Sequence, residues 1–141
     1  MGDPDPYRIL LVAEPSEAHR LKQRLSGARG PFTIEELEER ELGSSAAPAR
    51  LADRRTDLIL IGETVVNPLA AAQKARTSTP GQVLFLVPRE RLGRFRAGLP
   101  FVPNLASAWT ADADGEDLEL GELVTEAARG ARERAAVATA F

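Results

Sequence analysis

Short, nearly continuous apolar runs separated by more polar stretches dominate the chain. The runs YRILLVA (7–13), DLILIG (57–62) and QVLFLV (82–87) are rich in Leu, Ile and Val and do not alternate with polar residues. That pattern is typical of strands buried on both faces of a parallel sheet. Two weaker runs, PFTIEEL (31–37) and LASAWT (105–110), predict further strands. We therefore expect five strands in one sheet.

Segments of helical character fall between these strands. Helices are expected over residues 15–30, 44–55, 67–78, 88–99 and 116–139. Pro15 and Pro68 stand at the first positions of two of these helices, and Asn67 is the capping residue of the helix that begins with Pro68. Strands that alternate with helices at this spacing predict a doubly wound α/β fold of the flavodoxin-like class. Its natural strand order at this length is 2-1-3-4-5.

The domain organisation follows from the same pattern. A chain of 141 residues suits one domain. We expect a disordered leader over residues 1–6, the α/β domain over 7–130, and a C-terminal helix extension over 131–141. The second half of the last helix offers mostly alanine for packing. A dimer stalk, a link to a further domain and a frayed tail are the alternatives for it.

Composition and charge narrow the chemistry. The chain has no cysteine and a single histidine, His19, which removes thiolate metal sites and most zinc or Ser-His chemistry. We expect no metal and no cofactor. A formal net charge of -3 gives no electrostatic footprint for nucleic acid. No apolar run approaches the roughly 20 residues that span a bilayer, so we expect a cytoplasmic protein without membrane or nucleic-acid partners.

Sites in such open sheets lie at the carboxyl ends of the strands where the order reverses, here strands one and three. The sequences there are RILLVAEPSE and DLILIGETVVNP. Together with the fivefold strand–helix pattern over residues 7–130, they resemble the receiver domain of bacterial response regulators. The resemblance implies an aspartate at the end of the third strand that is phosphorylated, with magnesium held by acids after the first strand. It also implies a Ser or Thr ending the fourth strand and a Lys ending the fifth.

This sequence departs from that pattern at nearly every functional position. The corresponding residues are Ala13 and Glu14 for the acid pair, Gly62 for the acceptor, Val87 for the hydroxyl, and Thr110 or Ala111 for the lysine. Glycine has no nucleophile, and one carboxylate does not supply the octahedral oxygen set that magnesium prefers. Glu63 follows Gly62, but on a strand it points to the other face. We therefore expect a degenerate pseudo-receiver that lacks the phospho-acceptor.

A second surface carries the residue types of an interface. In the receiver family, the fourth helix, fifth strand and fifth helix form the face on which dimers assemble and outputs dock. The candidates there are Arg91, Arg94, Phe95, Phe101 and Trp109, and Arg and aromatic residues are enriched at interface hot spots. The alternative is a solvated arginine face over core aromatics. We favour the core for Phe95 and Phe101, and leave Trp109 open between an inward and an exposed position.

Three functions are weighed. The first is a phosphorylation-independent protein interaction or dimerisation module of a bacterial two-component signalling system, with a protein partner or a second copy docked on this face. The second is a small-ligand module that holds an apolar or quinone-like molecule in the emptied cleft. The third is another small α/β enzyme using Glu14, Glu63 or Ser16. No base is spaced to activate Ser16 and no Gly-x-Ser-x-Gly turn is present, so we expect no enzyme.

Overall fold

The computed structural model describes residues 6–26, 32–43, 56–78, 81–103, 105 and 107–140, with backbone alone from 135 to 140. Two sequence expectations fall outside this part of the chain. They are most of the leader, residues 1–5, and the helix over 44–55. The remaining expected elements can be compared with the structure directly.

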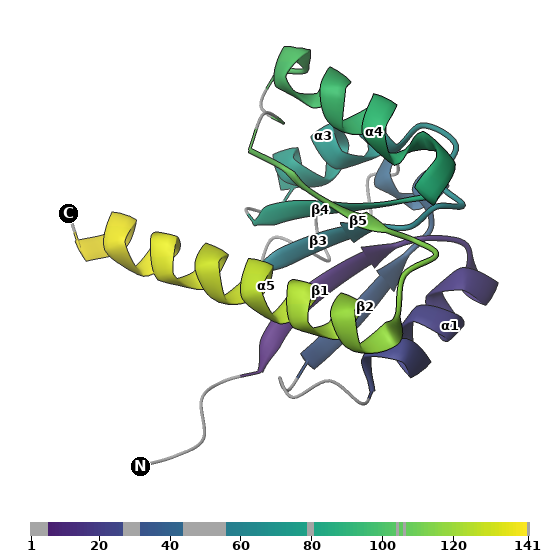
Figure 1. Ribbon diagram of the computed structural model, residues 1–141. Coiled ribbons are helices and arrows are strands. Elements are labelled where there is room, and N and C mark those ends of the chain that lie inside the picture. The colour runs from purple at the N-terminus through teal and green to yellow at the C-terminus, as the bar shows by residue number, and fades with distance from the viewer. Residues whose placement is uncertain are drawn as a thin grey trace.

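The described chain alternates strands and helices. In order, the elements are β1 (Tyr7–Val12), α1 (Pro15–Leu25), β2 (Phe32–Leu37), the 3₁₀ helix η1 (Glu39–Gly43), β3 (Leu58–Ile61), α3 (Pro68–Ser78), β4 (Gln82–Val87), α4 (Arg89–Gly98), the 3₁₀ turn η2 (Leu99–Phe101), β5 (Trp109–Asp112) and α5 (Asp117–Ala140). The five strands form one parallel sheet in the order β2-β1-β3-β4-β5 (Figure 1). The doubly wound α/β class and strand order predicted from the sequence are confirmed.

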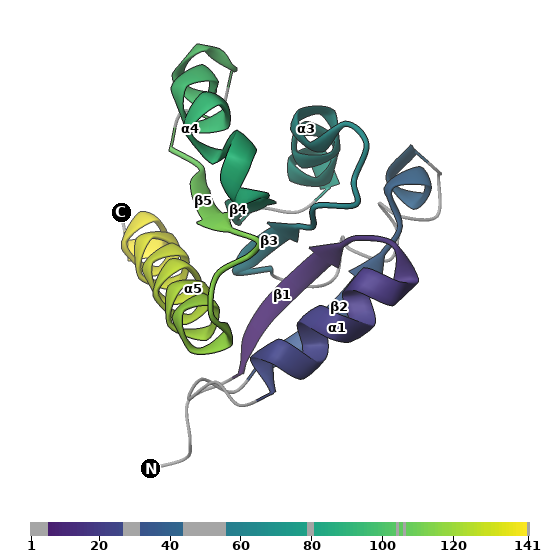
Figure 2. The ribbon, with the colours of Figure 1, turned by 45° about the vertical axis from the view of Figure 1, so that its right-hand side comes forward.

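Helices cover both faces of this sheet, which explains why the central strands read as continuous apolar runs. Figure 2 shows α1 and α5 on one face and α3 and α4 on the other. Successive side chains of a strand point to opposite faces. Ile9 and Leu11 of β1 accordingly pack in the cluster with α1 and α5, while Leu10 and Val12 pack in the cluster with α3. A strand buried on both sides favours apolar residues at consecutive positions.

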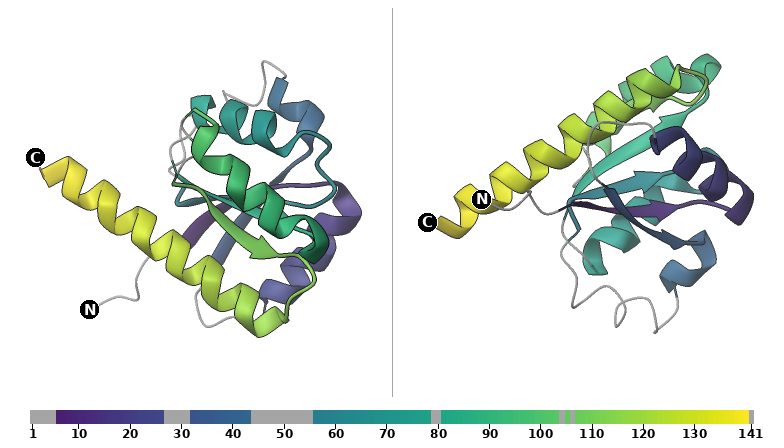
Figure 3. Two further views of the ribbon diagram at one scale, coloured as in Figure 1. Left: turned by 45° about the horizontal axis from the view of Figure 1, so that its top comes forward. Right: turned by 90° about the horizontal axis from the view of Figure 1, so that it is seen from below.

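The last helix is held to the amino end of the sheet by a buried ion pair. Arg132 lies 2.7 Å from the carboxylate of Asp57, which is 3% exposed. The same guanidinium stacks 4.5 Å from the centre of the Tyr7 ring, and Arg134 donates to Gln82 at 2.9 Å. Contact between α5 and the sheet therefore continues past residue 130, and Figure 3 shows the final turns extending beyond the sheet.

The fifth strand starts later than the sequence suggests. It runs from Trp109 to Asp112 rather than from residue 105. Leu105 is fully buried, but it sits in a turn where its N–H donates to Val102 and its carbonyl accepts from Ala108. Its apolar character therefore serves the core from a connection, which strand patterning alone does not distinguish. Within the described residues, no helix combines the length and apolarity needed to cross a membrane.

Candidate functional site

The end of β3 lies directly beside the end of β1. The Gly62 N–H donates to the Val12 carbonyl at 2.9 Å, so strand pairing continues one residue past β3. This bond brings Gly62 next to Ala13, which is 3% exposed and follows β1. The carboxyl ends of these two strands form the point where the strand order reverses, and ligand sites of open α/β sheets gather at that point.

A buried carboxylate from α1 reaches into this point. Glu17 belongs to the first turn of α1 and is 3% exposed. Its Oε2 accepts the N–H of Glu63 at 2.9 Å, and its Oε1 accepts the N–H of Thr64 at 3.0 Å and the Thr64 hydroxyl at 2.6 Å. Burying a charge is costly unless hydrogen bonds compensate for the lost water. Here three donors from two consecutive loop residues supply that compensation.

The carboxylate of Glu17 explains the glycine at position 62. A Cβ atom placed on Gly62 would collide with Glu17 Oε1 and would lie 2.8 Å from Glu17 Cδ and 2.9 Å from the Cβ of Ala13. Both separations are shorter than a normal carbon–carbon contact. A side chain at position 62 therefore requires the Glu17 carboxylate to move and the Ala13 methyl group to yield.

Thr64 extends the network to the segment after β1. Its hydroxyl donates to Glu17 and also accepts the N–H of Glu14 at 3.1 Å. The side chain of Glu14 itself is exposed. The hydroxyl thus joins three segments: the connection after β1, the first turn of α1 and the loop after β3. This hydroxyl thus donates one hydrogen bond and accepts one, both within the protein.

The other sequence-predicted pocket residues lie in different surroundings. Val87 is 6% exposed and packs in the cluster on the α3 side, whereas Ala111, also 6% exposed, packs on the α1 and α5 side. The Thr110 hydroxyl accepts from Arg96 Nε at 2.6 Å. Of the predicted set, the structure brings Ala13 and Gly62 together with the backbone of Glu14, and it gives the remaining three other neighbours.

An ion pair joins the end of β5 to the start of α4. Val87 pairs with Asp112 across the two strands, and Arg89 Nε donates to Asp112 Oδ2 at 2.7 Å. The hydrogen bond from Arg89 lowers the pKa of the Asp112 carboxyl below its ordinary 3.8, and the N–H of Asp114 adds to the effect. The same bond raises the pKa of Arg89. Both side chains are reached by solvent, so this pair orients the strand end more than it stabilises the fold.

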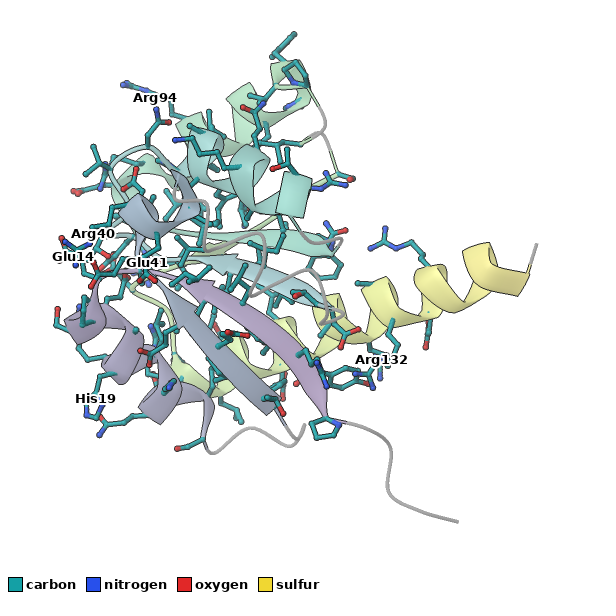
Figure 4. All side chains as sticks on the ribbon, turned by 180° about the vertical axis from the view of Figure 1, so that it is seen from behind. Glu14, His19, Arg40, Glu41, Arg94 and Arg132 are labelled. Carbon is teal, nitrogen blue, oxygen red and sulfur yellow. The ribbon has the colours of Figure 1, made fainter. Side chains whose placement is uncertain are left out.

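A cavity of about 480 Å³ opens next to Glu14, at the carboxyl ends of β1, β2 and β3. Its lining residues are Ala13, Glu14, Glu38, Glu39, Arg40, Thr64, Val65, Val66 and Lys74. Figure 4 shows Glu14, Arg40 and Glu41 gathered at this end of the molecule. Glu39 accepts the N–H groups of Val66 and Asn67, and Arg40 pairs with Glu38 at 2.6 Å. Charged side chains and the apolar side chains of Val65 and Val66 thus share the walls, and Gly62 is not among the lining residues.

The described part of the chain contains no cluster of side chains suited to a metal ion. Among those residues, no three His, Asp or Glu side chains come together in a group that could hold a metal ion. His19 is exposed on α1, where its ring nitrogen lies 3.3 Å from the amide of Gln23.

The candidate interaction residues divide between surface and core. Arg91 and Arg94 of α4 are exposed, and Figure 4 shows Arg94 at the surface. Phe95 is half-buried and meets the ring of Phe85 edge-on at 4.9 Å, as expected for a core residue. Phe101 is 86% exposed, so its expected place in the core is wrong. The 3₁₀ turn η2 turns Leu99 inward, at 5% exposure, and leaves Phe101 outside.

Trp109 is half-buried and packs against the cluster on the α1 and α5 side of the sheet. It therefore lies between the inward and exposed positions that the sequence left open. As the first residue of the edge strand β5, it has one neighbouring strand, and part of its ring stays at the surface.

Sequence reasoning missed Glu17. The signal that could have found it is helical spacing, because Glu17, Leu21 and Leu25 are four residues apart and share one face of α1. The two leucines are 2% exposed, so an acid that continues their row by one turn has to be buried. What spacing cannot supply is the partner, because Glu63 and Thr64 bind it through a loop 46 and 47 residues away.

The parallel sheet, its two helical layers and the site at the ends of β1 and β3 define a receiver-like α/β fold of the flavodoxin-like class. No protein-family model and no curated protein matches the sequence. A solved structure described as the crystal structure of adenylate cyclase from Rhodopirellula baltica is similar, with a TM-score of 0.62 and 18% sequence identity. The likeness covers 96% of this chain and 93% of that chain, and at this identity it concerns the fold alone.

Proposed function

We propose that the domain is a phosphorylation-independent interaction or dimerisation module of bacterial signal transduction, built on a receiver-like fold. The observation that carries the proposal is the pairing of Gly62 with Glu17. Position 62 has no nucleophile, and the space that an acceptor side chain requires is filled by the buried carboxylate. A receiver-like domain without an acceptor at the end of its third strand transmits its signal by contact alone.

The face around the edge strand β5 supplies complementary groups for such contact. Figure 2 shows α4 and α5 flanking β5 on its two sides. Arg91 and Arg94 are exposed on α4, and Glu119, Glu122 and Glu126 are exposed on α5. A basic and an acidic helix beside one edge suit an isologous pair, in which each helix meets the opposite charge on the other copy. We propose a second copy of the chain as the partner.

Phe101 adds an apolar element to this face. It is 86% exposed at the end of η2, directly after α4. An exposed aromatic ring gains by burial at an interface, and aromatic residues with arginine are the commonest interface anchors. Pro100 and Pro103 flank the ring and restrict the backbone that carries it. The ring is thus presented with little conformational entropy to lose.

The phosphorylation arm of the proposal is tested by intact-mass measurement. The protein is incubated with acetyl phosphate and magnesium, with an aspartate-bearing receiver domain treated in parallel as the positive control. We expect no phosphoryl adduct on this chain, and no rise of the unfolding temperature with magnesium and beryllofluoride. An adduct on any residue at the ends of β1 and β3 contradicts the proposal.

The association arm is tested by sedimentation equilibrium over a range of concentrations. Arg94→Glu is expected to disperse the pair, and mixing it with Glu122→Arg is expected to restore association because opposite charges again face each other. Arg20→Glu, at an exposed position of α1, serves as the matched control and is expected to leave association unchanged. A monomer at every concentration refutes self-association.

The charged cavity supports a second candidate, a small-ligand module. The space at position 62 is closed by Glu17, so a ligand would sit in the adjoining cavity of about 480 Å³. Glu14, Arg40 and Lys74 on its walls offer contacts to charges of both signs, beside the apolar surface of Val65 and Val66. Thermal unfolding with amino acids and nucleotides, on the wild type and Lys74→Ala, tests this candidate. A shift in the wild type that Lys74→Ala loses supports it, and the absence of any shift refutes it.

A further inference from the structure

We propose that the loop after β3 is an anion-binding site whose ligand belongs to the chain itself, the carboxylate of Glu17. The donors are the N–H groups of Glu63 and Thr64 and the Thr64 hydroxyl, at 2.6 to 3.0 Å from the two oxygens. Successive backbone N–H groups that converge in this way form the concavities in which proteins bind anions. The inference concerns the ligand of this loop and does not depend on whether copies of the domain pair.

The charge of Glu17 is compensated by these donors and not by a neighbouring cation. Among the residues that the structure describes, no Lys or Arg pairs with its carboxylate, although the side chain is 3% exposed. A buried anion held by backbone dipoles and one hydroxyl has the chemistry of a bound ligand, not of a salt bridge. An ordinary core position on α1 would hold an apolar residue, as Leu21 and Leu25 do on the same row.

The loop also excludes any competing side chain. Position 62 has no room for a Cβ while Glu17 keeps its place, so a side chain at 62 displaces the carboxylate from its donors. The Thr64 hydroxyl is fixed by the N–H of Glu14 and points its proton at the carboxylate. The donors of the anion site are therefore held in place before any ligand binds, and the Glu17 carboxylate occupies the site in the folded protein.

The identity of the internal ligand determines the external probe that can replace it. Glu17→Ala keeps the Cβ atom and removes the rest of the side chain, which has the heavy atoms of an acetate ion. Acetate added in solution can therefore present a carboxylate to the same donors. Small-molecule rescue of a truncated side chain requires a real, shaped site, because a merely destabilised core gives acetate no binding place.

The experiment compares unfolding of the wild type, Glu17→Ala and Glu14→Ala in sodium acetate and in sodium chloride of equal ionic strength. Glu14→Ala removes the same charge from the neighbouring exposed position and serves as the matched control. We expect Glu17→Ala to be less stable than the wild type and to recover with rising acetate but not with chloride. The general effect of each salt is expected to be the same in the wild type and in Glu14→Ala, so rescue is the additional stabilisation of Glu17→Ala beyond these two. No additional stabilisation by acetate, or the same additional stabilisation by chloride, overturns the proposal.

A second arm uses inorganic phosphate at the same ionic strength on the folded variants. Rescue of Glu17→Ala by acetate alone supports a site shaped for a carboxylate. Rescue by both anions supports the same site with a wider specificity. Because phosphate stabilises folded proteins generally, occupancy in the wild type is followed at the amide resonances. A shift of the Glu63 and Thr64 amides with phosphate overturns the inference that the internal ligand keeps the site filled.

Glu17→Gln provides a measurement if Glu17→Ala does not fold. The amide keeps the shape of the side chain but turns one acceptor into a donor that faces a backbone N–H. We expect the amide protons of Glu63 and Thr64 to shift and to exchange about tenfold or more faster, the loss of one bond to a charged group. Leu84 of the neighbouring strand β4, which pairs with Leu60 and has no bond to Glu17, serves as the reference. Unchanged resonances and exchange rates at Glu63 and Thr64 overturn the proposal.

Discussion

Replacing Gly62 with alanine tests the packing at the end of β3 most directly. The added methyl group meets the carboxylate of Glu17 and lies 2.9 Å from the Cβ of Ala13. Glu17 can move only by giving up bonds to Glu63 and Thr64, and the Ala13 methyl group has no rotamer to change. A single carbon atom is thus expected to disturb three segments at once.

The size of the effect follows from these contacts. Hydrogen bonds to a charged group contribute about 1.5–3 kcal/mol each, and forcing an extra methyl into a packed site costs about 1–3 kcal/mol. Part of the network survives if the carboxylate shifts by a few tenths of an ångström. We therefore expect Gly62→Ala to lower the free energy of unfolding by about 2–4 kcal/mol, far more than a glycine replacement at an open position.

Urea unfolding of a double-mutant cycle isolates the contact. Glu17→Ala alone leaves the N–H groups of Glu63 and Thr64 without their partner and is expected to cost about 2–4 kcal/mol. In the double variant the new methyl group enters the space that Glu17 has left. The double variant is therefore expected to be about 2 kcal/mol more stable than the sum of the single changes predicts. Additive losses, or a Gly62→Ala variant as stable as the wild type, refute the shared-space argument.

Three further changes probe other parts of the molecule. Arg132→Ala leaves Asp57 buried without its cation, so urea unfolding is expected to show a loss of about 3 kcal/mol. Phe101→Ala is expected to change stability by less than about 0.5 kcal/mol because the ring is exposed, and to weaken the proposed pairing at least about tenfold in sedimentation. In a carboxyl NMR titration, we expect a lowered pKa for Asp112 and a rise of that pKa in Arg89→Ala. The pKa of Asp112 is lower in the folded than in the unfolded protein. The ion pair therefore stabilises the fold at pH values above the unfolded pKa, and this stabilisation is lost as the pH falls through the folded pKa.

Each of these changes has a control or an outcome that contradicts it. Arg129→Ala lies on the same helix as Arg132, but its exposed pair with Glu126 spans 4.0 Å, so a loss below about 0.5 kcal/mol is expected. Equal losses in the two arginine variants refute a special role of the buried pair. Unchanged pairing in Phe101→Ala removes that ring from the interface. An Asp112 pKa that does not respond to Arg89→Ala disproves the assigned cause of the shift.

The fold was accessible from the sequence wherever apolar runs lie on central strands. The expected strand over 82–87 coincides with Gln82–Val87, and DLILIG contains β3, because both are buried on two faces. The edge strand β5 was placed too early, because Leu105 is as apolar as a strand residue but serves the core from a turn. A single-sequence pattern records burial, not the backbone conformation that achieves it.

The candidate site was accessible only in part. The missing side chain at Gly62 can be read directly, but the group that occupies its space comes from α1 and is visible only in three dimensions. Phe101 was misplaced for a related reason. Leu99 and Phe101 are both large and apolar, so the sequence does not show which of them is buried. The turn geometry of η2 buries Leu99 and leaves Phe101 exposed.

The exclusion between Glu17 and any side chain at position 62 also constrains how this sequence can change over generations. If a side chain is added at position 62 first, it collides with Glu17. If Glu17 is replaced first, the N–H groups of Glu63 and Thr64 lose their acceptor. Both single steps pass through a weakened protein, so the two positions form an epistatic pair. Each residue therefore favours retention of the other, and placing a side chain at position 62 requires a compensating change around Glu17.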